Sequence, residues 1–176
     1  VPKFSILNNN TEQLYTKGEI QVAIDRAKDG ATLLVGAGVY IIKQPLSFSG
    51  KAITLRGVEG PDRTVIRMAK DPRLGDRASV IIFENGETEN SILDGFTLTG
   101  GRGTLADDGG HSGLCGGGIF IKGSSPRVEN CIIRQNTATK VGGGVYVFES
   151  EPTLNGCLIA ENRVEGKHAD GGGVFV

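Results

Sequence analysis

Three consecutive glycines followed by alternating aliphatic and aromatic residues occur three times in the last third of the sequence. The segments read CGGGIF, VGGGVY and DGGGVF, and their triplets begin at Gly116, Gly142 and Gly171, which gives spacings of 26 and 29 residues. Recurrence at a nearly constant spacing is typical of repeat proteins, in which each repeat is one structural unit stacked on its neighbours. This repeat restricts the possible folds more than any other feature of the chain.

A second motif repeats at the same spacing. The segment PRVENCIIRQN, from Pro126, aligns with PTLNGCLIAEN, from Pro152, so proline, an aliphatic residue, cysteine, two aliphatic residues and asparagine recur 26 residues apart. An earlier, degenerate copy, SILDGFTLTGG from Ser91, places Phe96 where the later copies have cysteine. Three copies at a near-constant spacing indicate a stacked architecture.

Each repeat consists of short segments that have the pattern of β-strands. The segments are four to six residues long, are apolar at alternate positions and are bounded by Gly, Asn, Asp or Pro. A repeat of 26 residues is too short for a propeller blade, and it lacks the periodicity of a helix pair. With 28 glycines and no tryptophan among 176 residues, the composition also favours strands joined by tight turns. The sequence therefore predicts an all-β fold, a single-stranded parallel β-helix (solenoid) in which each strand pairs with its counterpart one coil later.

Alternation along the strands assigns side chains to the inside and the outside of the coil. In GIFIK, GVYVF and GVFV we expect the aliphatic residues to point inward: Ile119, Ile121, Val145, Val147, Val174 and Val176. The aromatic residues Phe120, Tyr146 and Phe175 then point outward. They could form an exposed row, stack on one another as neighbours on paired strands do, or lie beneath a long preceding loop.

The same alternation predicts a ladder of apolar side chains inside the coil. Its rungs are Val128 over Leu154, Cys131 over Cys157, and Ile133 over Ile159. Stacked thiols can act as small apolar groups in a core, and a bond between neighbouring coils is the alternative. The three cysteines are an odd number without a CxxC pair, which argues against a zinc site and against a disulfide framework.

Corners between the strands explain the repeated glycines and asparagines. Where coils stack about 4.8 Å apart, a corner often needs a positive φ, which glycine adopts without steric cost. Asn136 and Asn162, 26 residues apart, mark a second corner. Stacked asparagines can hydrogen-bond through their amides and tolerate left-handed φ, so we interpret both as structural.

The N-terminal half has the pattern of a capped first coil. Ile20, Ala23, Ile24 and Ala27 share one helical face, and the predicted helix ends near Gly30. A helix there would cover the first coil, whose core and strand edge would otherwise meet water. Further strands are predicted at residues 31–35, 38–42, 52–56, 64–68 and 79–83, with a protruding polar loop at residues 69–78.

We expect one domain over residues 1–176, with an N-terminal capping segment at residues 17–30 and about five coils over residues 31–176. The sequence stops at GGGVFV, in the middle of a repeat, without a capping helix. Terminal coils need a cover, so we expect either a fragment truncated at the C-terminal end or self-association through that end.

The charge balance restricts the possible partners. The chain has 19 basic and 20 acidic residues, a net charge of −1, so nothing favours a nucleic acid as a partner. No stretch approaches the 18 apolar residues of a membrane span, so we expect no membrane-spanning segment.

At this point the sequence resembles a known superfamily. The segments IQVAIDRAKDGATLLVGAGVY and GKAITLRG are similar to the start of right-handed parallel β-helix proteins of the pectin-lyase-like superfamily. The coils SSPRVENCIIRQNTA and GGGVYV resemble those of secreted or surface-attached bacterial repeat proteins. The resemblance implies right-handed coiling, with a short N-terminal capping α-helix, and a secreted or cell-surface bacterial location. It leaves function open, because the superfamily includes lyases, hydrolases, epimerases, adhesins and inert spacers.

Candidate site residues lie in the loops that precede the glycine triplets. The longest loop carries Arg102, Asp107, Asp108 and His111, and a later loop carries His168 and Asp170. Beside the aromatic row Phe120, Tyr146 and Phe175, these groups could bind a polysaccharide, with rings against sugar faces and polar groups on hydroxyls. Three of the carboxylates could bind Ca²⁺, the one cofactor that the sequence makes possible: Asp107, Asp108 and Asp170.

Two functional hypotheses follow from these residues. The segment DDGGHS resembles the Asp-Asp pair and Gly-His-Gly segment of polygalacturonases, but both elements here lie in one loop instead of on successive coils. Paired carboxylates can do acid–base work only at a defined separation, so Asp107, Asp108 and His111 are weak catalytic candidates. The favoured hypothesis is a non-catalytic extracellular or cell-surface module that is structural, adhesive or glycan-binding. The alternative is a polysaccharide lyase or glycoside hydrolase acting on an acidic polysaccharide.

Overall fold

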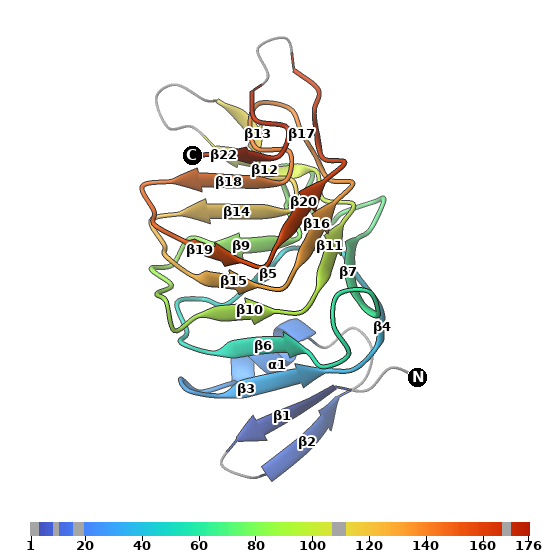
Figure 1. Ribbon diagram of the computed structural model, residues 1–176, viewed down its shortest axis with the longest axis vertical. Coiled ribbons are helices and arrows are strands. Elements are labelled where there is room, and N and C mark those ends of the chain that lie inside the picture. The colour runs from blue at the N-terminus through green and yellow to red at the C-terminus, as the bar shows by residue number, and fades with distance from the viewer. Residues whose placement is uncertain (1–3, 9–10, 16–19, 107–111, 167–169) are drawn as a thin grey trace.

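The chain forms a parallel β-helix, seen from the side in Figure 1. This computed structural model describes residues 4–8, 11–15, 20–106, 112–166 and 170–176.

The coils have three faces, each formed by one sheet with five parallel strands. The first sheet contains β3 (Thr32–Val35), β6 (Thr54–Gly57), β10 (Ile92–Asp94), β15 (Arg127–Glu129) and β19 (Thr153–Asn155). The second contains β4 (Gly38–Ile42), β7 (Thr64–Met68), β11 (Thr97–Thr99), β16 (Ile132–Arg134) and β20 (Leu158–Ala160). The third contains β5 (Leu46–Ser47), β9 (Ile81–Phe83), β14 (Ile119–Lys122), β18 (Val145–Phe148) and β22 (Val174–Phe175).

The strand register confirms the predicted repeat alignment. Val128 lies opposite Leu154, and Ile133 lies opposite Ile159, so the intervening cysteines are stacked neighbours. The preceding coil is in the same register, with Leu98 opposite Ile133, which places Phe96 beneath Cys131 as expected. One core cluster runs through the coils along this ladder. In-register stacking therefore converts a sequence repeat into a continuous apolar interior.

The two roles of glycine at the corners are distinct. The first glycine of each triplet has a left-handed φ, +63° at Gly116, +62° at Gly142 and +64° at Gly171, which confirms the predicted positive φ. The third glycine is required for a different reason. A Cβ on Gly118 would lie 2.7 Å from the carbonyl oxygen of Gly144 in the next coil, so only glycine allows this approach.

The asparagine ladder is also present. Nδ2 of Asn136 donates to Oδ1 of Asn162 at 3.0 Å and to the carbonyl of Leu98 at 3.1 Å, while Oδ1 of Asn136 accepts from the Gly101 amide at 2.9 Å. The asparagines themselves do not have a left-handed φ. The left-handed residues are Gln135 and Glu161, with φ of 54° and 57°, because the sharp turn precedes the asparagine and directs its amide inward.

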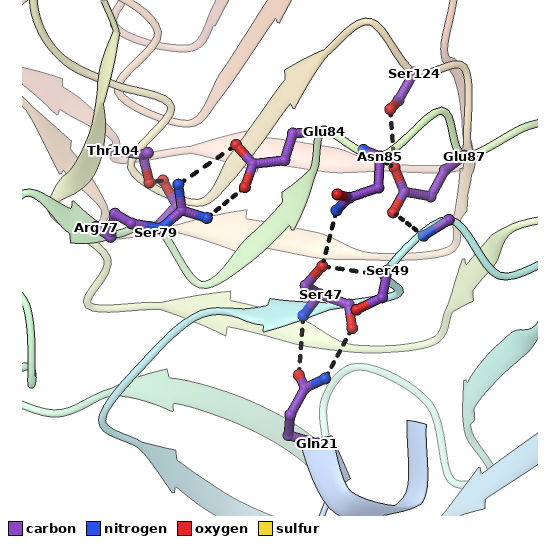
Figure 2. Close-up of polar contacts among 11 residues, drawn as sticks. Gln21, Ser47, Ser49, Arg77, Ser79, Glu84, Asn85, Glu87, Thr104 and Ser124 are labelled. Carbon is purple, nitrogen blue, oxygen red and sulfur yellow. Dashed lines mark hydrogen bonds and ion pairs between the residues drawn. The ribbon is translucent and has the colours of Figure 1, made fainter. Parts of the chain in front are cut away.

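Helix α1 (Ile20–Arg26) confirms the predicted capping helix, with Ile20, Ala23 and Ile24 buried, but it ends before Ala27 and so before the predicted end near Gly30. It packs against β5, and the Gln21 amide accepts from the Ser47 amide and donates to the Ser47 carbonyl, both at 3.0 Å (Figure 2). Within the described residues, no helix is long and apolar enough to cross a membrane.

An antiparallel hairpin at the N-terminus was not predicted. It consists of β1 (Phe4–Asn8) and β2 (Thr11–Tyr15), and β1 pairs antiparallel with β3. The pairing occupies the outer edge of the first strand of the first sheet (Figure 1). The hairpin and α1 thus cover this end of the solenoid together, which reduces the exposure of an edge strand.

The predicted strands are found with small shifts. Those at residues 38–42 and 64–68 have the predicted bounds, whereas the strands predicted at 31–35, 52–56 and 79–83 begin one or two residues later. The predicted polar loop at 69–78 instead contains β8 (Arg77–Ala78), because β12 (Gly103–Ala106) supplies a pairing partner from far along the chain. Strand β12 also pairs with β13 (Gly113–Cys115).

A buried carboxylate ties three coils together at the corner between the third and first sheets. Glu87 is 1% exposed and accepts hydrogen bonds from the Gly50 amide at 2.9 Å, the Asn85 amide at 2.9 Å and the Ser124 hydroxyl at 2.8 Å (Figure 2). A buried charge is tolerated only when hydrogen bonds replace its lost hydration. Glu87 is therefore a structural residue.

Replacing Gly118 tests the close approach of the coils. We expect Gly118→Ala to lower the free energy of unfolding by about 1–3 kcal/mol, because the added methyl group has no room in the packed corner. Gly75, whose Cβ would meet nothing within 4 Å, is the matched control. Gly75→Ala should change stability by no more than about 0.5 kcal/mol in the same urea titration. Equal effects of the two substitutions would contradict the explanation.

The stacked cysteines predict an order of thiol reactivity. Burial raises the pKa of Cys131 to about 12, and burial also raises the pKa of the half-buried Cys157. Since the thiolate is the reactive form, the native protein at pH 8 should be alkylated slowly at Cys157 and more slowly still at Cys131. Mass spectrometry of the alkylated peptides checks this order. The raised pKa of Cys131 contributes stability that is complete below the unfolded value of about 9.0 and is lost as pH rises toward 12. Modification of native Cys131 as fast as in the unfolded chain would show that the ladder is not formed.

Candidate functional site

Most of the loop residues singled out in the sequence lie outside the described residues. These are Asp107, Asp108, His111 and His168, so their catalytic and calcium-binding roles stay predictions. Asp170 is exposed, and its backbone forms a bridge with Val141. Arg102 is exposed, and its backbone amide donates to the Ala78 carbonyl at 2.8 Å. Within the described part of the chain, no three His, Cys, Asp or Glu side chains come together as a metal site.

The aromatic row points outward from the coil but is not an open surface. The ring centroids of Phe120 and Tyr146 lie 5.2 Å apart, and those of Tyr146 and Phe175 lie 6.1 Å apart. Phe120 is 2% exposed and Tyr146 is 0% exposed. They form a second apolar cluster with residues of the β12–β13 hairpin and its surroundings: Ile82, Ala106, Cys115 and Val141. The stacked and covered arrangement therefore applies, and only the half-buried Phe175 retains an accessible side chain.

The aliphatic residues predicted to point inward are buried in β18 but exposed at the C-terminal end of the third sheet. Val145 and Val147 lie in the core, whereas Val174 is 39% exposed and Val176 is 87% exposed. Val174 pairs in register with Val145, so it keeps the inward position that alternation predicts. Val174 is exposed because β18 covers β22 from one side only.

A groove lies where the second sheet turns into the short strands β17 (Thr137–Ala138) and β21 (Arg163–Val164). We call it the elbow groove. It has a volume of about 510 Å³, and two successive coils contribute its lining: Gln135, Asn136, Thr137, Glu161, Asn162 and Arg163. Ligand sites are usually concave, so this groove is a candidate site within the described residues.

The backbone explains why these side chains line the groove. The left-handed Gln135 and Glu161 bend each coil sharply, and the following asparagine turns its amide inward to the ladder. The side chains of Gln135 and Glu161 are exposed, and Nε2 of Gln135 donates to Oε2 of Glu161 at 2.9 Å. One residue beyond the asparagines, Thr137 pairs with Arg163. Equivalent positions of neighbouring coils therefore stand side by side along the groove.

The groove presents hydrogen-bonding groups of several kinds. An amide, a hydroxyl, a carboxylate and a guanidinium group lie at Gln135, Thr137, Glu161 and Arg163 respectively. Of the six lining residues only Glu161 has a carboxylate, whereas glycoside hydrolysis generally requires a pair. The arrangement suits recognition of a hydroxyl-rich ligand better than acid–base chemistry.

The first sheet carries a second polar surface on its outer face. Arg56, Asp94 and Glu129 are neighbours in register on successive strands. Nε of Arg56 lies 2.7 Å from Oδ2 of Asp94, and Nδ2 of Asn130 donates to Oδ1 of Asp94 at 2.9 Å. Nη2 of Arg127 lies 2.7 Å from Oε1 of Glu129. Each of these two carboxylates is thus held in an ion pair with an arginine.

Sequence reasoning missed both polar surfaces, although the repeat contains a signal for each. Polar residues flank each corner asparagine, as QNT in one coil and ENR in the next. The outer ladder of the first sheet occupies the position before the corner residue in LRG, LDG and VEN. Aligning the exposed positions of the repeat, as well as its apolar ones, would have found both.

Comparison of the sequence with known protein families supports the fold. Residues 63–176 match the family model described as the right handed beta helix region, which is more than half of the chain. No match was found among curated proteins or among solved structures. The match confirms the predicted handedness, and the parallel sheets and resemblance to pectin-lyase-like repeat proteins agree with it. The chain therefore belongs to the family of right-handed β-helix proteins.

Proposed function

We propose that this protein is a non-catalytic β-helix module that binds a polysaccharide along the elbow groove. The observation that carries the proposal is the lining of the groove, in which two successive coils offer hydrogen-bonding side chains at matching positions. Sugar hydroxyls both donate and accept hydrogen bonds, so the mixture of amide, hydroxyl, carboxylate and guanidinium groups is suited to them.

The scaffold supports binding to an extended ligand. Neighbouring coils are about 4.8 Å apart, and their positions are fixed by the packed core and by the asparagine ladder. The polar groups at Gln135 and Glu161 are therefore held at a regular spacing on a rigid surface. A rigid surface loses little conformational entropy on binding, which favours affinity.

The same proposal places the protein outside a bacterial cell or at its surface, in a structural or adhesive role. The protein would encounter a polysaccharide ligand outside the cell or at its surface. Cys131 is a fully buried free thiol with a raised pKa, which makes it slow to oxidise in such a compartment. Cell fractionation with an antibody against the protein tests this location, and recovery only in the cytoplasm would contradict it.

Removal of the groove side chains tests the binding role. We expect the triple variant Gln135→Gly, Glu161→Gly, Arg163→Ala to bind at least about tenfold more weakly, a loss of about 1.4 kcal/mol. Glycine is chosen at the two left-handed positions because it adopts that φ freely, so the turn is kept while the side chain is lost. Affinity electrophoresis in gels containing neutral or acidic polysaccharides measures the effect, and titration calorimetry with fragments of a retarding polymer gives the affinity.

The control is Arg67→Ala, which removes an exposed arginine of β7 in the second sheet that does not line the groove. It should bind within about twofold of the native protein, a difference of about 0.4 kcal/mol. Unchanged binding by the triple variant would refute the proposed site. New unsaturated or reducing ends that disappear in the double variant Asp107→Ala, Asp108→Ala would instead establish the enzymatic alternative.

A further inference from the structure

A second concave site lies on the first coil, between helix α1 and the end of strand β4. We call it the cap cleft. It has a volume of about 260 Å³, and its lining includes Ile20 of α1, Tyr40 and Ile41 of β4, Lys43 of the following turn and Leu46 of β5. A cavity of about 150 Å³ can hold a molecule the size of benzene, so the cap cleft has room for an apolar body of about six carbon atoms.

The floor of the cap cleft is apolar and well fixed. Ile20 and Leu46 are each 2% exposed, and Tyr40 is 1% exposed, because they pack in the core of the first coil. The Tyr40 hydroxyl donates to the Gly36 carbonyl at 2.8 Å, so its polar group is already satisfied. Ile41 lies on the other face of β4 and is 57% exposed. Hydrocarbon placed in this cleft would remove apolar surface from water, which favours binding.

Hydrogen bonds to the chain beyond β4 hold α1 in a position that leaves the cleft open. The Gln21 side chain bonds the backbone of Ser47 (Figure 2). At the other end of the helix, Nζ of Lys51 donates to the carbonyls of Ile24 and Asp25 at 2.7 and 2.5 Å. The helix is therefore anchored over β5 and the corner that follows it, and not over the end of β4. A helix shift that closed the cleft would break these bonds.

The mouth of the cap cleft carries positive charge. Lys43 and Gln44, both exposed, also line an adjoining shallow hollow with Asp71, Pro72 and Arg73. The Arg73 amide donates to the Lys43 carbonyl at 2.6 Å, which holds the two cationic residues side by side. Nζ of Lys43 lies 3.2 Å from Oδ2 of Asp71, but these side chains are 66% and 80% exposed, so the ion pair contributes little stability. An anionic group of a ligand can replace Asp71 at small cost.

We propose that the cap cleft binds a small amphipathic carboxylate, with an alkyl or aryl body and one anionic head. The body lies against Tyr40 and Ile41, and the carboxylate pairs with Lys43 and Arg73. The site is independent of the proposed polysaccharide binding, because it belongs to the first coil, whereas the fourth and fifth coils form the elbow groove.

Titration of the native chain with hexanoate, followed by NMR of the ¹⁵N-labelled amides, tests the proposal. We expect saturable shifts concentrated on residues 40–46, with a Kd of about 1 mM, a modest affinity for so small a ligand. Acetate keeps the charge without the body, and it should give no saturable shift there. Hexanamide keeps the body without the charge, and it should bind at least about fivefold more weakly than hexanoate.

Substitutions of exposed residues separate the body from the head. Ile41→Ala should weaken hexanoate binding at least about threefold, because it removes apolar lining. The matched control is Val39→Ala, on the same face of β4 but outside the cleft, which should stay within about twofold. The double variant Lys43→Gln, Arg73→Gln should weaken hexanoate at least about fivefold and leave hexanamide within about twofold. Its control is Lys70→Gln, an exposed cation of the same loop that lines neither hollow.

Asp71→Asn gives the sharpest result, because a gain in affinity is expected. The variant removes the carboxylate that competes for Lys43, so hexanoate should bind about two- to threefold more tightly and hexanamide should bind as before. Absence of saturable shifts at residues 40–46 with about 20 mM hexanoate would overturn the proposal. Shifts that acetate reproduces would also overturn it, as would equal effects of Ile41→Ala and Val39→Ala. Unchanged hexanoate binding by the double variant would overturn the assigned carboxylate position.

Discussion

The structure depends on one geometric constraint, the stacking of successive coils in register about 4.8 Å apart. At that spacing every position of a coil meets the same position of its neighbour, so each residue must be compatible with a copy of itself. Apolar residues satisfy the condition by packing, and asparagine satisfies it by bonding amide to amide, as Asn136 and Asn162 do. Glycine satisfies it by absence of a side chain at Gly118 and Gly144. The repeat in the sequence is the consequence of this condition.

The same constraint generates the surfaces that can bind a ligand. Outward positions recur at the coil spacing as regularly as inward positions do. The residue type at an outward position can differ from coil to coil, because it does not have to pack in the core. At the elbow the variation yields Gln135 beside Glu161 and Thr137 beside Arg163. On the first sheet it yields charges that neutralise one another, Arg56 with Asp94 and Arg127 with Glu129. The groove, with unlike hydrogen-bonding groups in a concave site, is therefore the better candidate for recognition.

Insertions modify the solenoid without interrupting it. The β12–β13 hairpin leaves the coil after the third strand of the second sheet and folds over the outward aromatic row, where Tyr146 becomes fully buried. Its strand β12 also recruits β8 from the preceding coil. A loop that departs from the repeat thus gains its own small sheet and apolar cluster, which extends the packed volume outside the coil.

The sequence by itself determined the parallel β-helix, the inward ladder through Cys131 and Cys157, the glycine corners and the capping helix. It could do so because these features rest on short-range periodicity that stacking repeats from coil to coil. Tertiary structure alone decided that Phe120 and Tyr146 are covered, that β8 pairs with β12 and that Gln135 and Glu161 take the left-handed turn. Those outcomes depend on contacts between segments far apart in the chain, or on which of two adjacent residues absorbs a bend. No local pattern of residue types encodes either one.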